Sequence, residues 1–342
     1  MIFSDINSLI MVLIYGIVAS AISFLTVYFA MPKAITSLRE KGSIVQDYHK
    51  PKRPTIPRPA GPILVIGITL SLIVIYLLTF NEKSLAILLT TIIAFLVGYI
   101  DDRKVMPGWF KPAALVISAL PILILGAHDT NLNLIFGTAF IPLLYIPIIL
   151  IAIPVIGNTI NSIDVLNGVA SGFILIACIP LMISVYIFGS IEVFLASLSL
   201  FFGTIAFYKF HKFPSKIFPG DSGTLLLGAM YGAIAITGKS ELIAIIALLP
   251  AIFNSFLFLS SVKKIIEHRK ITARPTFLTN DFKLAASKDK KAPITLLRLL
   301  LVDGPLSENE LVNKIFKLAI FSSILALISI VIQYYFVIGG RI

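Results

Sequence analysis

Two adjacent aspartates follow directly on a long apolar run, in the stretch VGYIDDRK of residues 97–104. A carboxylate at the edge of hydrocarbon is costly, so such a pair usually holds a cation or lines a water-filled site. Asp101 and Asp102 are therefore candidates for chemistry. The alternative is that both are solvated acids at a helix end beside Arg103 and Lys104.

A second motif, GNTINSIDVLNGVASG at residues 157–172, repeats a polar residue at every third position: Asn158, Asn161, Asp164 and Asn167. Each such step drifts about 60° around an ideal helix, so the four side chains cannot share one face. The pattern favours a helix interrupted near the turn-type dipeptide Asn167-Gly168, with exposed backbone lining a cavity. The alternative is a set of polar residues that join neighbouring helices.

A third motif, FPGDSGT at residues 218–224, places Asp221 between two glycines. Asp221 could cap the helix that follows, or it could bind a metal ion, and the two roles are compatible.

Because the chain is expected to cross a membrane, the loops at 47–62 and 101–111 are expected on the same side of it as these motifs. Together they offer the carboxylates above, amides, and the cations Lys50, Lys52, Arg58, Lys104 and Lys111. Hard oxygen ligands beside Lys and Arg suit a magnesium or manganese ion that holds a di- or triphosphate. Four scattered histidines and one cysteine, Cys178, argue against a zinc site.

The composition determines the environment of the chain. It is 58% hydrophobic and 13% charged over 342 residues, with mean hydropathy +0.98, well outside the range of soluble domains. We expect an all-α integral membrane protein that forms a single polytopic domain over residues 1–342. The acidic N-terminus lacks a basic region, so the first apolar run reads as a retained span. Ten apolar runs are long enough to cross a bilayer: 9–30, 61–80, 84–100, 112–127, 132–156, 168–188, 190–208, 222–238, 241–261 and 315–338.

Basic residues set the expected orientation. The connections after the first, third, fifth, seventh and ninth runs hold 24 of the 28 Lys and Arg residues. These connections should face the cytoplasm, which places both termini outside and all the motif loops inside a multi-pass protein of the cell membrane. The net charge of +11 then reflects topology, and no nucleic-acid partner is needed to explain it.

The longest cytoplasmic loop should cover about residues 262–314. Its stretch APITLLRLLLV (292–302) is apolar and basic enough for the membrane interface. Ser307 and Glu310 form an S-x-x-E capping box that predicts a helix running towards the last span.

Taken together, DD, NxxNxxDxxNG, FPGDSGT and a basic loop before the last span resemble the polyprenyl-phosphate N-acetylhexosamine-1-phosphate transferases, in matching order from Asp47 to Arg274. The first loop, KPKRPTIPRPAG, and ARPTF (273–277) are most similar to the archaeal and eukaryotic dolichyl-phosphate N-acetylglucosamine-phosphotransferases. The bacterial peptidoglycan branch carries a run of histidines in its last cytoplasmic loop, whereas EHRKITARPTF has one.

The resemblance implies a reaction. The phosphate of a membrane polyprenol, in this branch dolichyl phosphate, attacks the β-phosphorus of UDP-GlcNAc, releases UMP and leaves polyprenyl-PP-GlcNAc, the first step of lipid-linked oligosaccharide synthesis for N-glycosylation. The resemblance also assigns roles. Asp221 and Asn161 hold magnesium, Asp101 accepts a proton from the lipid phosphate or orients it, Asp102 supports the site, and Lys111 neutralises phosphate. Substrate-binding residues are Asn158, Asp164, Asn167, Phe218, His268, Arg269 and Arg274, of which Asn167 and Phe218 match uridine contacts.

Several alternatives remain open at this stage. Asn167 stands where the bacterial branch has an aspartate, so it fits a base-reading amide better than an acid. It is open which of His268, Arg269 and Arg274 contacts the sugar. The donor could also be another UDP-HexNAc, with undecaprenyl phosphate as the acceptor. The chain could form a homodimer. A secondary transporter is the competing class, but the acids gather at the ends of the runs instead of at mid-membrane, where a translocation path needs them.

Overall fold

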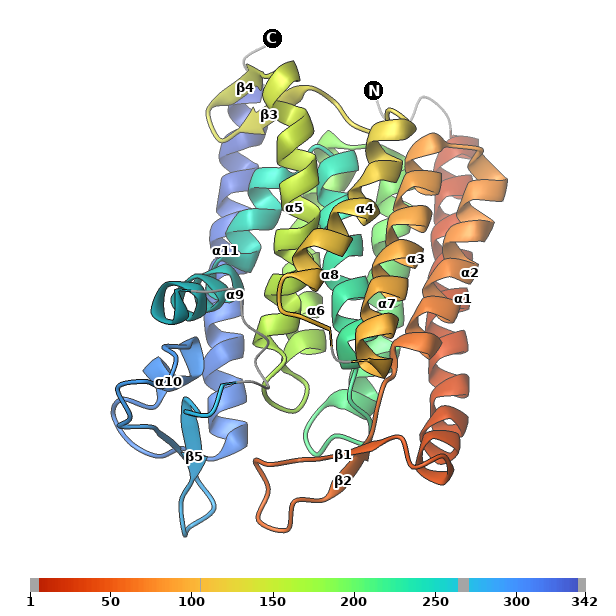
Figure 1. Cartoon of the computed structure of the whole chain (residues 1–342). Helices are drawn as coiled ribbons and strands as arrows, with labels where there is room; N and C mark the ends of the chain where they lie inside the picture. The colour runs from red at the N-terminus through yellow and green to blue at the C-terminus, as the bar shows by residue number, and fades with distance from the viewer. Residues whose placement is uncertain (1–5, 105, 264–270, 338–342) are drawn as a thin grey trace.

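The computed structural model describes residues 6–104, 106–263 and 271–337, and its long helices form one bundle (Figure 1). Each of the ten predicted runs contributes a helix. They are α1 (Ile6–Glu40), α2 (Gly61–Thr79), α3 (Glu82–Arg103), α4 (Phe110–Ile124), α5 (Pro142–Ile163), α6 (Val169–Phe188), α7 (Ile191–His211), α8 (Gly220–Thr237), α9 (Glu241–Val262) and α11 (Glu308–Val337). The all-α membrane fold is confirmed.

Eight helices in the described part of the chain are long and apolar enough to span a membrane. The other two are α4, which has only 15 residues, and α8, which has 18. The first turn of α8 carries Asp221 and Ser222, which lower its hydropathy. Every residue of α8 is buried, and the helix packs against α3 and α5. Because protein covers α8 on all sides, its polar first turn can be satisfied by neighbouring helices.

One predicted span was wrong at its start. Residues 132–156 were expected to be one helix, but the segment opens as an antiparallel hairpin of β3 (Asn131–Leu134) and β4 (Gly137–Phe140). Polar and apolar residues alternate in NLNL, which suits a strand, and α5 begins only at Pro142, a favoured residue at a helix start. At the other end of the bundle, α1 continues to Glu40, beyond its expected end near residue 30.

The predicted interruption near Asn167-Gly168 is confirmed. Helix α5 ends at Ile163 and α6 begins at Val169. Gly168 has φ +81, a left-handed conformation that glycine adopts without a steric penalty. The turn between the two helices therefore carries Asp164 and Asn167 outside regular helix.

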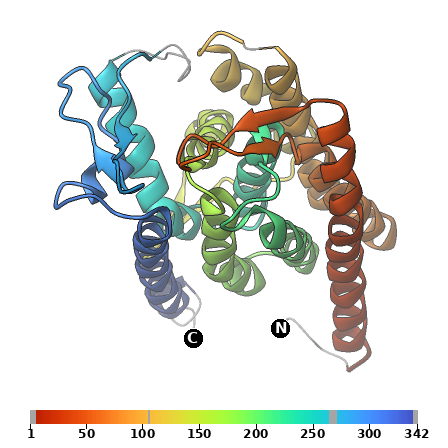
Figure 2. The same ribbon diagram turned by 90° about the horizontal axis from the view of Figure 1, so that it is seen from below.

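The hairpin β3–β4 lies beside the end of α11, whereas the other irregular segments gather at the opposite end of the bundle (Figures 1 and 2). They include the hairpin β1 (Ile44–Gln46) with β2 (Thr55–Pro57), the hairpin β5 (Thr276–Leu278) with β6 (Leu284–Ala286), and the short helix α10 (Leu296–Leu300). The capping box is confirmed: the Glu310 carboxylate accepts from the Ser307 backbone N–H at 2.7 Å, and the Glu310 N–H donates to the Ser307 hydroxyl at 3.3 Å.

Candidate active site

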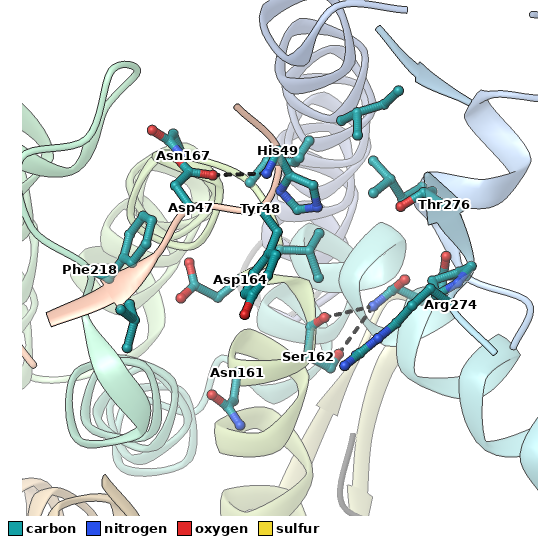
Figure 3. Close-up of a pocket in the computed structure, with 18 of the residues that line it drawn as sticks. Asp47, Tyr48, His49, Asn161, Ser162, Asp164, Asn167, Phe218, Arg274 and Thr276 are labelled. Carbon is teal, nitrogen blue, oxygen red and sulfur yellow. Dashed lines mark hydrogen bonds between the residues drawn. The ribbon is translucent and has the colours of Figure 1, made fainter. Parts of the chain in front are cut away.

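A cavity of about 730 Å³ lies at this loop-bearing end, between the hairpin β1–β2 and the segment of β5 and β6. Figure 3 shows Asp164, Asn161 and Phe218 on one side of it and Arg274 and Thr276 on the other. Seven of the residues predicted from sequence line it: Lys111, Asn161, Asp164, Asn167, Phe218, Asp221 and Arg274. Asp101, Asp102 and Asn158 lie outside its lining, and His268 and Arg269 fall outside the described residues.

Asp221 is the centre of the charged wall. Its Oδ1 lies 2.8 Å from Nζ of Lys111, and its Oδ2 lies 2.7 Å from Nη2 of Arg58. Asp221 is only 5% exposed, so the two cations offset much of the cost of burying its charge.

Arg58 bridges two carboxylates, because the same Nη2 also lies 2.9 Å from Oδ1 of Asp102. Burial of the guanidinium opposes its charge, but Asp221 and Asp102 more than compensate and raise the pKa of Arg58 above its usual value. The bridge explains how the first loop, which carries Arg58, is attached to α3 and α8.

Asp102 caps α8 from a different helix. Its Oδ1 accepts from the Asp221 backbone N–H at 2.9 Å, and its Oδ2 accepts from the Ser222 N–H at 2.9 Å and the Ser222 hydroxyl at 2.6 Å. A carboxylate at a helix N-terminus satisfies unpaired N–H groups and is stabilised by the helix dipole. Asp102 thereby fixes the start of α8, and with it the position of Asp221.

Asp101 is fully buried. Its Oδ2 pairs with Nζ of Lys111 at 3.0 Å, and its Oδ1 accepts from the Met106 N–H at 3.1 Å. Lys111 therefore sits between Asp101 and Asp221, and it is Lys111, not Asp101, that faces the cavity.

Gly98, four residues before Asp102, permits this arrangement. A Cβ at this position would lie 2.5 Å from the Asp221 carbonyl oxygen and 2.5 Å from Cα of Ser222. Both neighbours are backbone atoms that cannot rotate away. The glycine allows α3 to approach the first turn of α8 closely enough for the Asp102 cap to form.

The two predicted asparagines of α5 point in different directions. Oδ1 of Asn161 accepts from the Thr224 hydroxyl at 2.7 Å, which holds the amide between α5 and α8 at the cavity wall. Asn158 donates from Nδ2 to the Pro154 carbonyl oxygen of its own helix at 2.8 Å. This bond turns the Asn158 amide back along its own helix.

Asp164 ends α5 and faces the cavity, with 19% of its side chain exposed. Burial raises its pKa to about 7; Arg58 opposes the rise and Asp221 adds to it. Nε2 of His211 lies 3.6 Å from Oδ1 of Asp164, while Nδ1 of His211 is 2.7 Å from the Ser171 hydroxyl. The raised pKa means that the negative charge of this carboxylate lacks full compensation in the folded protein. The position therefore favours an approaching cation.

Asn167 is 2% exposed, and both the oxygen and the nitrogen of its side-chain amide form hydrogen bonds. Its Oδ1 accepts from the Ser215 N–H at 2.7 Å and from Nζ of Lys50 at 3.1 Å, and its Nδ2 donates to Asp47 at 3.1 Å. One amide hydrogen is left for a ligand. Phe218 contacts the ring of His211 edge-on, with centroids 6.5 Å apart.

The opposite wall is held in place by Asn254. Its Nδ2 donates to the Ser162 carbonyl oxygen at 3.2 Å and its Oδ1 accepts from the Leu296 N–H at 3.0 Å, which ties α9 to α5 and to α10. Arg274 is exposed and lines the cavity near Ser162 (Figure 3). The described residues provide Arg274 with no ion-pair partner.

The donor set suits a hard divalent cation. No group of three His, Cys, Asp or Glu side chains that could hold a metal occurs among the described residues. Asp221, Asn161 and Asp164 nevertheless line one cavity, and magnesium typically takes one or two carboxylates and completes its coordination with waters and substrate phosphates. The residues present therefore fit magnesium bound together with a phosphorylated substrate.

Several site residues were not among the residues predicted. Arg58 was recognised only as one of several loop cations, while His211, Ser162 and Asn254 were not singled out. The motif HKFPSKIFPGD contains His211 seven residues before Phe218 of the FPGD segment, so its position was available. Ser162 and Asn254 join helices far apart in sequence, and no local pattern marks them.

The part of the chain that carries much of the site is similar to known proteins. Residues 84–239 match the model of glycosyl transferase family 4, a range that contains Asp101, Lys111, Asn161 and Asp221. A phospho-N-acetylmuramoyl-pentapeptide-transferase of Streptococcus mutans is 28% identical over 249 residues, which cover 66% of this chain and 73% of the relative.

Two archaeal relatives are about as similar. A provisionally named UDP-N-acetylglucosamine–dolichyl-phosphate N-acetylglucosaminephosphotransferase of Saccharolobus solfataricus is 26% identical, over 64% of this chain and 69% of the relative. A provisionally named glycosyltransferase of Methanocaldococcus jannaschii is 28% identical over 92% of this chain and 95% of the relative. These similarities support a membrane glycosyl-1-phosphate transferase of the polyprenyl-phosphate N-acetylhexosamine-1-phosphate transferase superfamily, with residues 84–239 similar to glycosyl transferase family 4.

Proposed function

We propose that this transferase uses UDP-GlcNAc as donor and a polyprenyl phosphate of the dolichyl type as acceptor, and produces polyprenyl-PP-GlcNAc and UMP. An oxygen of the lipid phosphate forms a new bond to the β-phosphorus. The bond between the β-phosphorus and the oxygen that bridges it to the α-phosphorus breaks, and that oxygen leaves with UMP. The observation that carries the proposal is the convergence of Arg58, Lys111 and Asp221 on one cavity.

Lys111 and Arg58 are placed to neutralise the phosphates. Both line the cavity, and each is held by a second carboxylate besides Asp221: Asp101 for Lys111 and Asp102 for Arg58. Fixed cations of this kind stabilise charge that shifts to the leaving phosphate without reorganising. The burial of Asp101 favours the role of orienting Lys111 over direct contact with the lipid phosphate.

Asp221 and Asn161 would hold magnesium, with Asp164 beside them. When bound, the metal would supply positive charge to the diphosphate of the donor. Lys111 and Arg58 can then turn from Asp221 towards the substrate phosphates, since both are long side chains that already face the cavity.

The nucleotide is read by the neighbourhood of Asn167 and Phe218. The ring of Phe218 can pack on a uracil face, and the remaining amide hydrogen of Asn167 can donate to a carbonyl of the base. Arg274 on the opposite wall is the described member of the three basic residues proposed for the sugar.

The cavity faces the cytoplasm in this proposal. Support comes from the basic residues, which are concentrated in the connections at the cavity end of the bundle, since such residues remain cytoplasmic. A soluble nucleotide sugar would then enter from the cytoplasm, while the lipid acceptor approaches from the bilayer.

A second donor is favoured by one observation. The relatives named as phospho-N-acetylmuramoyl-pentapeptide-transferases are as similar as the archaeal ones, which makes UDP-MurNAc-pentapeptide a serious competitor as the donor. A donor with a peptide needs more room beyond the sugar than UDP-GlcNAc does.

The test is UMP release by the purified protein in detergent, with magnesium, a polyprenyl phosphate and a panel of UDP-sugars. The proposal predicts release from UDP-GlcNAc that depends on the acceptor and stops in EDTA. If UMP is released from UDP-MurNAc-pentapeptide alone, the donor is UDP-MurNAc-pentapeptide and not UDP-GlcNAc. If turnover is undiminished in EDTA, the reaction does not require a metal ion.

A further inference from the structure

Lys50 and the buried Glu308 form an ion pair beside the cavity that the reaction itself does not use. Their charged atoms, Nζ of Lys50 and Oε2 of Glu308, lie 2.6 Å apart. The two residues are 258 positions apart in sequence, and both lie outside residues 84–239, the range of the family match. Neither residue lines the cavity.

Glu308 makes a second contact with its other oxygen. Oε1 accepts from the Asn167 backbone N–H at 2.9 Å. Glu308 is 7% exposed, so the carboxylate is committed to these two partners. The first residue of α11 is thus attached both to the first loop and to the turn between α5 and α6.

Lys50 extends the connection. Besides Glu308, its Nζ lies 3.0 Å from Oδ2 of Asp47 and 3.1 Å from Oδ1 of Asn167, and it sits 4.4 Å from the ring centre of Phe213. Asp47 in turn accepts from Nδ2 of Asn167 at 3.1 Å. Four segments that are remote in sequence therefore meet at one half-buried lysine.

The segments that meet here carry one whole side of the cavity lining. Asp47, Tyr48 and His49 come from the first loop, and Val165, Leu166 and Asn167 come from the α5–α6 turn. Figure 3 shows Asp47, Tyr48 and His49 above Asp164 and close to Asn167. The pair determines how far the first loop stands from the turn, and so the width of the cavity on this side.

We propose that Glu308, acting through Lys50 and Asn167, is a positioning residue for the nucleotide half of the donor. It shapes the part of the cavity that receives the nucleotide and leaves the phosphate-transfer groups unaffected, because Asp221, Lys111 and Arg58 are held by contacts with Asp101 and Asp102 instead. The inference rests on the proposed function, in that it takes a uridine nucleotide as the ligand of this side.

The test compares Glu308→Ala and Glu308→Gln with Glu310→Gln, in UMP-release kinetics and in equilibrium binding of UMP. The alanine variant loses both contacts, whereas glutamine keeps an acceptor for the Asn167 N–H and loses only the charge. Glu310 lies in the same first turn of α11, but its carboxylate contacts Ser307 and is distant from the network, so it is a matched control.

We expect Glu308→Ala to raise the KM for the UDP-sugar and the Kd for UMP roughly tenfold, about 1.4 kcal/mol, since it leaves the buried Asn167 N–H without its acceptor and removes one of the two carboxylates that pair with Lys50. Glu308→Gln should have a smaller effect in the same direction. The kcat at saturating donor and the KM for the polyprenyl phosphate should stay within about twofold, as for Glu310→Gln.

Lys50→Met combined with Glu308→Gln adds a coupling test. Because the two residues act as one unit, the double variant should weaken UMP binding less than the product of the two single effects. This coupling test does not use Glu308→Ala, so it still tests the inference if that variant fails to fold.

The inference is wrong if the folded Glu308 variants bind UMP as tightly as the wild type, or if kcat and both KM values change in proportion. Multiplicative single effects in the double variant would also contradict it. These outcomes differ from failure of the proposed function, in which the wild-type protein itself releases no UMP from UDP-GlcNAc.

Discussion

The two ends of the helix bundle both bury carboxylates, but they arrange them differently. At the loop-bearing end, Asp101, Asp102 and Asp221 share two cations, Arg58 and Lys111, along the wall of a large cavity. At the opposite end, buried Glu241 accepts a hydrogen bond from the Tyr145 hydroxyl, and Asp129 pairs with Lys239.

The difference shows which feature marks a site. None of Asp129, Tyr145, Lys239 and Glu241 lines the cavity, and each pair links helices or loops. Buried charge alone is therefore compatible with a purely structural role. At the loop-bearing end, three carboxylates compete for two cations that a phosphate could also bind, which makes exchange of partners possible.

The largest expected effect is from Asp221→Ala, which should lower UMP release about a hundredfold or more, because it removes the proposed metal ligand and leaves Lys111 and Arg58 without their shared partner. Glu241→Gln is the matched control at the other end and should retain activity within about twofold. Both are measured with saturating donor and magnesium, and folding is checked by size-exclusion chromatography. An active Asp221→Ala protein would contradict the assignment of the active site to the loop-bearing end of the bundle.

A smaller effect is expected from Asp102→Asn. The amide keeps one acceptor oxygen but loses the ion pair with Arg58 and part of the cap on α8, so both activity and stability should fall. The loss of stability should be about 1–2 kcal/mol, the usual cost of a lost cap. Thermal unfolding and UMP release are measured on the same preparation. A variant as stable as the wild type would show that the α8 N-terminus does not depend on this carboxylate.

Gly98→Ala should move the α8 N-terminus without changing any charged group. The added Cβ meets backbone atoms of Asp221 and Ser222, and overpacking of this kind costs about 1–3 kcal/mol. Gly16→Ala is the control, since its Cβ would meet only leucine side chains, at 3.3 and 3.6 Å. We expect reduced kcat in Gly98→Ala alone. Equal kcat in the two variants would argue against a close approach of α3 and α8.

A separate effect, on stability alone, concerns pH. The pKa of Asp164 is raised to about 7, while an unfolded aspartate titrates near 3.9. Between about pH 4 and 7 the folded protein keeps a proton that the unfolded chain releases, so stability falls as pH rises through this window. Asp164→Asn should remove that slope. Thermal midpoints from pH 5 to 8 without metal or nucleotide test this, and parallel curves for the two proteins would contradict it.

Much of the site could be predicted from local sequence, because Asp101-Asp102, the NxxNxxDxxN repeat and FPGD each place polar residues where an apolar segment ends. The break at Gly168 followed from the three-residue spacing. The Asp102 cap on α8, the bridge by Arg58 and the pair of Lys50 with Glu308 could not be predicted, because each joins segments 44 to 258 residues apart. The hairpin at 131–140 was missed because the run that follows it is apolar enough to hide the change from alternating to continuous hydrophobicity.

The most direct test of the central claim is to locate the nucleotide on the chain. Purified protein would be photolabelled with 5-azido-UDP-GlcNAc in magnesium, and the labelled peptides identified by mass spectrometry with excess UMP as competitor. The account predicts UMP-sensitive label in the segments 45–49, 161–167 and 211–218, which line the cavity. Label confined to residues 129–145 or 239–241, at the other end of the bundle, would contradict it.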